Sequence, residues 1–385
     1  MTQPVPTPVK GLAAVSLFND VASEMVYPLL PAFVTRIGGS AAMLGLLDGA
    51  AEFTSAILKW VSGRLSDRPG LRKPLILAGY GTAVLVRPLI SVASAAWQVV
   101  GFRVLDRVGK GLRTAPRDAL IADVTPEGSE GRSFGLHRAA DHLGAVLGSV
   151  VAWLLLAQGA DVPDVIRWSL LPGLVAIAVL LVALRGTGSG SRGRGVGPND
   201  RSASLRSSIA PSYRPMVALA LFSALRMPET LILLRLQQVG LSVALVPLAW
   251  AGLHVVRSAA SYPAGEWSDR VGPRRLIALA GLFAAAIMVG FGVIESAPAA
   301  VGLLLLFGLV AAVAEPAERS LVAQLDPARR GRGFGSFHGL VGLASLPAAL
   351  GFGILTDARG ATVAFVVSAV LLGVLTIGWV ATFRE

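Results

Sequence analysis

Carboxylates stand at helical spacing inside stretches that are otherwise apolar. Asp20 and Glu24 are four residues apart, as are Asp48 and Glu52, so each pair lies on one face of a helix. An ionisable group at the middle of a bilayer costs at least about 2.5–3.5 kcal/mol, so such groups normally face a cavity and serve a function. The chemistry that these residues suggest is binding of a charged solute or transfer of protons.

Basic residues form a matching stripe. At 100° per residue, Arg103, Arg107 and Lys110 lie within about 60° of one another on a helix. Counting residues from the helix ends places Asp20, Asp141 and Arg107 at similar depths, with Arg103 one turn deeper. These groups are therefore expected to lie near one another.

Two interpretations of these charges are open. In the first, a polar cavity binds substrate or protons through residues of the N-terminal half, with one contact from the C-terminal half, as follows: Asp20, Glu24, Glu52, Arg103 and Asp141, with Arg226. In the second, Arg103 and Arg107 are paired with Asp141 and Asp106 and only hold helices together. For Asp20 and Glu24 the functional interpretation is favoured.

Histidines near Asp141 suggest a further role. His137 and His142 are candidates for a proton relay, because histidine titrates close to neutral pH. A metal site with Asp141 is disfavoured, since the two histidines diverge around a helix and the chain has no cysteine. No metal and no cofactor are expected.

The elements that carry these residues are apolar and long. The chain of 385 residues is 54% hydrophobic and 15% charged, with a mean hydropathy of +0.67, which predicts an all-α membrane protein. A helix needs about 20 apolar residues to cross a bilayer. Twelve such stretches are predicted, at residues 11–35, 41–63, 74–94, 95–116, 134–157, 166–184, 215–237, 241–265, 274–294, 297–321, 334–355 and 361–380.

The chain divides into two similar halves. A Gly-, Ser- and Arg-rich run predicts a linker over 185–214, between six-helix bundles at 1–184 and 215–385. At an offset of 200, Pro116 corresponds to Pro316 and Gly131 to Gly331. An internal duplication of this kind is typical of transporters with a site between the repeats.

The net charge of +11 is explained by topology. Arginines and lysines concentrate in the loops after the second, fourth, eighth and tenth predicted helices, which all fall on one side. By the positive-inside rule, both termini are cytoplasmic and the protein is a multi-pass protein of the inner (plasma) membrane. Nucleic acid is not an expected partner.

The loop motif Gly63-Arg-Leu-Ser-Asp67-Arg68-Pro-Gly-Leu-Arg72 resembles the G-x-L-x-D-R-x-G-x-[RK] signature of the major facilitator superfamily. A second copy starts at Gly265. The resemblance implies two pseudo-symmetric six-helix bundles around a central cavity. It also implies a cytoplasmic gate formed by Gly63, Asp67, Arg68, Gly265, Asp269 and Arg270.

A drug/proton antiporter motif in the fifth predicted helix is only partial. Gly144 and Gly148 fit G-x3-G-P-x2-G, but Ala145 replaces the proline.

The chain contains no Gly-x4-Gly-Lys-Ser/Thr phosphate loop, so an ion gradient is the expected source of free energy.

We therefore expect a secondary transporter and not an enzyme. The favoured activity is proton-coupled export of a small organic compound by alternating access. The alternatives are a permease for an anion or a metal complex, and a non-transporting sensor with the same fold. Expected partners are the lipid bilayer, a small-molecule substrate and protons or another coupling ion, and the family suggests a monomer.

Overall fold

Helices make up the whole of the regular structure in the part of the chain described here. The computed structural model describes residues 5–66, 68, 70–126, 130–185, 213–325 and 330–383. Its helices follow the apolar stretches of the sequence, because each stretch must satisfy its backbone hydrogen bonds internally in lipid. In chain order the α-helices are Thr7–Glu24 (α1), Leu30–Arg36 (α2), Ala41–Ser66 (α3), Arg72–Leu89 (α4), Ala96–Val124 (α5), Glu130–Ala157 (α6), Val162–Trp168 (α7), Leu170–Arg185 (α8), Tyr213–Leu225 (α10), Glu229–Gln238 (α11), Val246–Val271 (α12), Pro273–Val293 (α13), Ala297–Leu325 (α14), Arg330–Arg359 (α15) and Ala361–Thr382 (α16).

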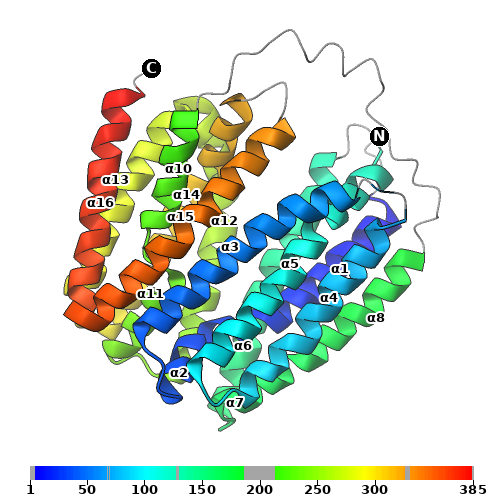
Figure 1. Ribbon diagram of the computed structural model, residues 1–385, viewed down its shortest axis with the longest axis horizontal. Helices are drawn as coiled ribbons and strands as arrows, with labels where there is room; N and C mark the ends of the chain where they lie inside the picture. Colours follow the sequence, from blue (N-terminus) through cyan, green and yellow to red (C-terminus); the bar gives the residue numbers. More distant parts are fainter. Residues whose placement is uncertain are drawn as a thin grey trace.

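The helices form two groups side by side (Figure 1). One group contains α1 to α8 and the other contains α10 to α16, and α3 of the first packs along α15 of the second. Residues 186–212, which make up most of the predicted linker, lie outside the described part of the chain. We call the end of the molecule that contains α2, α7 and α11 the closed end, for the contacts reported below. The beginning of α1 and the end of α16 lie at the opposite end.

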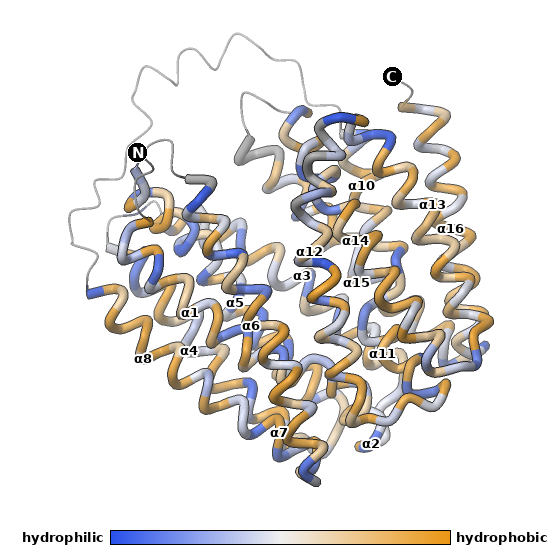
Figure 2. Tube along the Cα trace, turned by 180° about the vertical axis from the view of Figure 1, so that it is seen from behind, coloured by the Kyte–Doolittle hydropathy of each residue, from blue (hydrophilic) through white to orange (hydrophobic). Residues whose placement is uncertain are grey.

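Apolar residues dominate the outer helices (Figure 2). Ten helical segments among the described residues are long and apolar enough to cross a membrane. The remaining two long segments are α1 with α2 and the helix α5, which carry several charged residues each. The structure thus has a helical segment at each of the twelve predicted positions. The two segments that are too polar to meet the hydropathy criterion carry several of the candidate site residues.

The first predicted helix of each half is interrupted at its middle. A short 3-10 helix, Tyr27–Leu29, separates α1 from α2, and a non-helical segment at 226–228 separates α10 from α11. Each interruption contains a proline, Pro28 or Pro228, which has no N–H to donate to the preceding turn. The apolar pattern of the sequence predicts a continuous helix at both places, so these interruptions correct that expectation.

Glycines allow helices to approach closely, both between the two groups and within one group. A Cβ added at Gly45 of α3 would lie 2.1 Å from the carbonyl oxygen of Ala349 on α15, and one at Gly144 of α6 would lie 2.4 Å from that of Leu17 on α1. Only glycine fits at such a crossing. At Gly63, where close approach was expected, an added Cβ would be at an ordinary 3.6 Å from Ala115.

The two copies of the loop motif share one backbone feature. Gly70 and Gly272 stand at equivalent motif positions and both have positive φ, at 80° and 90°. This conformation is readily adopted only by glycine. The shared turn gives the sequence repeat a physical basis.

Candidate functional site

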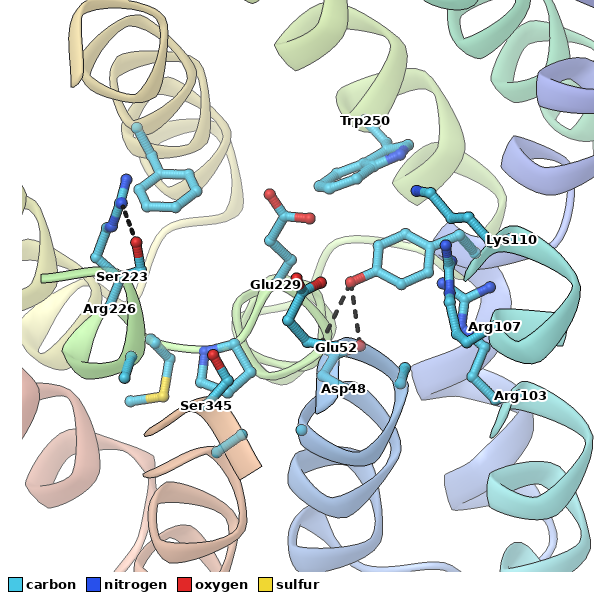
Figure 3. A pocket seen from close by; sticks show the side chains of 18 of the residues that line it. Asp48, Glu52, Arg103, Arg107, Lys110, Ser223, Arg226, Glu229, Trp250 and Ser345 are labelled. Atoms are coloured by element: carbon cyan, nitrogen blue, oxygen red, sulfur yellow. Dashed lines mark hydrogen bonds between the residues drawn. The ribbon is translucent and has the colours of Figure 1, made fainter. Parts of the chain in front are cut away.

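A cavity of about 390 Å³ lies between the two groups of helices. Figure 3 shows charged side chains of α3 and α5 on one side and residues of α10, α11, α12 and α15 on others. Charged residues and one histidine make up about half of the lining, as follows: Glu24, Asp48, Glu52, Arg103, Arg107, Lys110, Arg226, Glu229, His254 and Arg257. The cavity is therefore strongly polar although it lies within the membrane-spanning part.

Behind the α5 side of the cavity, one carboxylate forms ion pairs with three guanidinium groups. Asp106 lies 2.9 Å from Arg87 Nε, 3.5 Å from Arg103 Nη1 and 3.7 Å from Arg107 Nε. Its side chain is only 1% exposed, and Arg87 also donates to the backbone oxygen of Asn19 at 3.0 Å. Burial weakens competition from water, so this network fixes α4 and α5 to α1. It bears out part of the structural interpretation, with Asp106 and not Asp141 as the partner.

The C-terminal side of the cavity is built from separate ion pairs. Arg226, directly after α10, lies 3.0 Å from Glu318 of α14, and Arg257 of α12 lies 2.8 Å from Glu229 of α11. Each cation here has a carboxylate of its own. The positive charge of this side is compensated locally, in contrast to that of α5.

Three carboxylates join the two groups of helices through neutral donors. Trp250 Nε1 donates to Glu24 Oε2 at 2.9 Å, and the hydroxyl of Thr230 donates to Asp48 at 2.8 Å. Asp357 of α15 accepts from the backbone N–H groups of Ala41 and Ala42, at the first turn of α3. Among hydrogen bonds whose partners are both described, those between the two groups lie at or near the closed end.

The predicted site residues fall into two sets. Glu24, Glu52, Arg103 and Arg226 line the cavity. Asp20 and Asp141 do not, because they face the contact between α1 and α6. There Asp141 accepts a hydrogen bond from Ser16 and lies 3.5 Å from His137.

The relay candidates, Gly63, Arg68 and Arg270 are not among the residues that line the cavity. His137 is buried beside Asp141, while His142 does not line the cavity. Asp67 falls outside the described residues, and Gly265 and Asp269 are described only as part of the α12 backbone. Gly63 lies in α3, while Arg68 and Arg270 lie near the ends of α3 and α12. The gate and the relay remain predictions.

Several lining residues were missed as site residues. The rings of Tyr27 and Trp250 pack against each other across the boundary between the groups, with centroids 5.4 Å apart and planes tilted by 47°. The spacing of Asp48 to Glu52 could have pointed to Asp48 as a cavity residue. In the same way, the shared helix face of His254 and Arg257 could have pointed to these two residues. For the two aromatic residues no spacing pattern points to the cavity, because their partners come from distant parts of the chain.

Comparison with known proteins agrees with this architecture. The sequence matches the profile of the Major Facilitator Superfamily over residues 12–256 and 215–385. An uncharacterised MFS-type transporter of Methanocaldococcus jannaschii is 29% identical over 357 residues, covering 89% of this chain and 87% of the relative. The multidrug resistance protein MdtH of Photorhabdus laumondii is 28% identical over 343 residues, covering 85% of this chain and 80% of the relative.

Solved structures share the fold at low sequence identity. The nucleoside transporter NupG superposes with a TM-score of 0.77 at 10% identity, covering 99% of this chain and 100% of the other. A D-xylose-proton symporter gives a TM-score of 0.75 at 17% identity, covering 96% and 95%. Two bundles of helices around a charged cavity, together with the family match over nearly the whole chain, show that this protein belongs to the Major Facilitator Superfamily of integral multi-pass membrane transporters.

Proposed function

We propose that the protein exports a small organic compound from the cell in exchange for protons, by alternating access. It acts as a monomer in the inner (plasma) membrane with both termini cytoplasmic, so the closed end described above faces outward. The excess of arginine and lysine in the loops on the side of the termini supports this orientation. The family match supports transport itself.

One observation carries the proposal for proton coupling. Glu24 and Asp48 both line the cavity, and both accept hydrogen bonds from the other group of helices. A carboxylate forms much stronger hydrogen bonds as the anion than as the neutral acid. Protonation therefore changes the strength of the contacts between the two groups of helices, which couples the protonation of Glu24 and Asp48 to the change between conformations.

The surroundings of these two carboxylates fit such a role. Glu24 faces Trp250 and His254, whose Nε2 lies 3.8 Å away. Asp48 is bonded by Tyr27 and Thr230, with no cation within ion-pair distance among the described residues. Neutral donors stabilise a carboxylate anion less than a paired arginine does.

Export is supported by the relatives named for multidrug resistance, MdtH, at 28% identity. A permease for an anion is the second candidate, because Arg103, Arg107 and Lys110 form a basic side of the cavity. The two candidates differ in the direction of proton movement that accompanies the substrate.

Inverted membrane vesicles that contain the protein provide the test. Respiration acidifies the lumen, and a pH-sensitive dye reports loss of the gradient when a panel of small organic cations, anions and zwitterions is added singly. We expect at least one compound to release protons from the vesicles. Glu24→Gln and Asp48→Asn should reduce that release at least tenfold, whereas Glu295→Gln, in an exposed loop, should leave it unchanged.

Two results count against the proposal. Transport of a compound that is insensitive to the pH gradient would exclude proton coupling. Proton uptake into the lumen together with an anion, in place of proton release, would favour the anion permease.

A further inference from the structure

The charges around the cavity are separated in the N-terminal group of helices. Carboxylates of α1 and α3 (Glu24, Asp48 and Glu52) face one part of the cavity. Cations of α5 face another part, and the single carboxylate behind them, Asp106, is shared by three arginines. This half therefore presents an acidic side and a basic side to the same cavity.

Tyr27 holds the two sides apart. The guanidinium carbon of Arg103 lies 4.8 Å from the centre of the Tyr27 ring, and the hydroxyl of the same ring donates to Asp48 at 3.3 Å. The aromatic ring thus satisfies the cation on its face and the anion at its tip. A direct ion pair between Arg103 and Asp48 is replaced by contacts that keep both near the cavity (Figure 3).

Two of these charged groups, Lys110 and Glu52, have only longer-range electrostatic interactions in the part of the chain that the structure describes. Lys110 and Glu52 line the cavity, and neither makes a hydrogen bond or an ion pair with another described residue. The side chain of Arg103 is only 4% exposed, and its Nε is buried without a hydrogen-bond partner. An unpaired buried donor is costly, so a ligand that supplies an acceptor is favoured here.

The opposite side of the cavity lacks this property. Arg226 is paired with Glu318, and Arg257 is paired with Glu229. A lipophilic drug placed in the cavity would desolvate the unpaired groups of α3 and α5 without replacing their interactions with water, which is unfavourable. The volume of about 390 Å³ also lies near the lower limit of ligand pockets, which is about 300 Å³.

We infer that the cavity binds a small hydrophilic zwitterion, with its anionic group against Arg103, Arg107 and Lys110 and its cationic group against Glu52. This inference rests on the proposed function, since it names the class of compound that is transported. The contacts between Glu24 or Asp48 and the C-terminal helices remain free for proton coupling. Recognition of the substrate charges is thereby assigned to the N-terminal helices.

Matched probes test the inference on the purified full-length protein. The probes are 4-aminobutyrate as zwitterion, butyrate as the anion alone, n-butylamine as the cation alone, and tetraphenylphosphonium as a lipophilic cation. A panel of further amino carboxylates and amino phosphonates of similar length extends the zwitterion class. A bound ligand raises the midpoint of thermal unfolding, so we expect the largest increases from zwitterions and none from tetraphenylphosphonium.

Two variants separate the charges of the ligand. Glu52→Gln should lower the affinity for the best zwitterion at least tenfold and leave affinity for its anionic analogue unchanged. Lys110→Met should have the opposite selectivity, retaining binding of the cationic analogue. The exposed residues Glu295 and Lys10 supply the controls Glu295→Gln and Lys10→Met, and size-exclusion profiles establish that each variant is folded.

The outcomes are distinct from those of the transport test. The inference is overturned if no zwitterion in the panel stabilises the protein, whether or not tetraphenylphosphonium or a singly charged probe does so. If tetraphenylphosphonium also releases protons from vesicles, proton-coupled export stands and only the substrate class is wrong. If zwitterions bind and none moves protons, the substrate class stands and the coupling is wrong.

Discussion

The α5 side of the cavity and the C-terminal side use their charges in different ways. On α5, Arg103 and Arg107 share Asp106 with Arg87 of α4, and Lys110 makes no ion pair with another described residue. In the C-terminal helices the two arginines that reach the cavity, Arg226 and Arg257, each have one carboxylate. Related folds in the two halves have therefore been given different electrostatic roles.

This difference separates binding from structural support. A paired cation has its charge satisfied and mainly holds helices together, whereas an unpaired one keeps its interaction for a ligand. The comparison predicts that substitutions on the α5 side disturb stability or recognition strongly, and that those on the C-terminal side have smaller, local effects.

The largest effect is expected at Asp106. Asp106→Asn leaves three buried or mostly buried guanidinium groups without a carboxylate, which should cost about 3–5 kcal/mol in the free energy of unfolding. Thermal unfolding in detergent and the yield of monodisperse protein measure the loss. Asp164→Asn, in an exposed ion pair with Arg167, is the matched control and should cost little. Equal stability of both variants would show that Asp106 does not organise α5.

A smaller effect is expected at Glu318. Glu318→Gln leaves only Arg226 without its ion partner, so unfolding should become easier by about 1–3 kcal/mol. The same thermal measurement applies. If Glu318→Gln destabilised the protein as much as Asp106→Asn, the contrast between the shared and the separate carboxylates would be lost.

Contacts between the two groups of helices should affect conformation more than stability. Asp357→Asn weakens two charge-assisted hydrogen bonds to the first turn of α3, which should shift the equilibrium toward an open outer end by about 1 kcal/mol. The chain has no cysteine, so spin labels can be attached only at the introduced Thr35→Cys and Ser242→Cys. The distance between these two labels would report the separation of the two groups of helices at the outer end. We expect a longer-distance population to increase roughly fivefold.

The control for that measurement is Asp161→Asn, an exposed carboxylate beside α7. It should leave the distance distribution unchanged. An unaltered distribution in Asp357→Asn itself would contradict a role for Asp357 in closing this end.

The smallest effect is expected for the pair of Arg257 and Glu229, which are 23% and 29% exposed. A double-mutant cycle with Arg257→Gln and Glu229→Gln should give a coupling free energy of about 0.5–1 kcal/mol, because water competes with the pair. A coupling of several kcal/mol would place this pair with the Asp106 network.

Local patterns predicted the fold and part of the cavity. The spacing of Arg103, Arg107 and Lys110 placed them on one helix face, and all three line the cavity. The repeated loop motif is matched by the turns at Gly70 and Gly272. In these cases the structure depends on residues that are close together in the sequence, through helical periodicity or through a backbone conformation that requires glycine.

Contacts between distant segments could not be predicted in this way. Arg226 was assigned to the substrate, yet it also pairs with Glu318, which lies 92 positions later. Asp20 was placed in the cavity from its depth, its spacing to Glu24 and the family resemblance, but its direction around α1 turns it toward α6. Depth follows from counting residues, whereas direction depends on how helices pack, which a single sequence does not specify.

The interruptions at Pro28 and Pro228 have a mechanical consequence. Because the backbone hydrogen-bond ladder is already broken there, α2 and α11 are short rods joined to α1 and α10 by a few residues. These rods pack on each other at the closed end. They can tilt together about the two breaks without unwinding a turn of helix, so the outer end can widen at little cost in backbone hydrogen bonding.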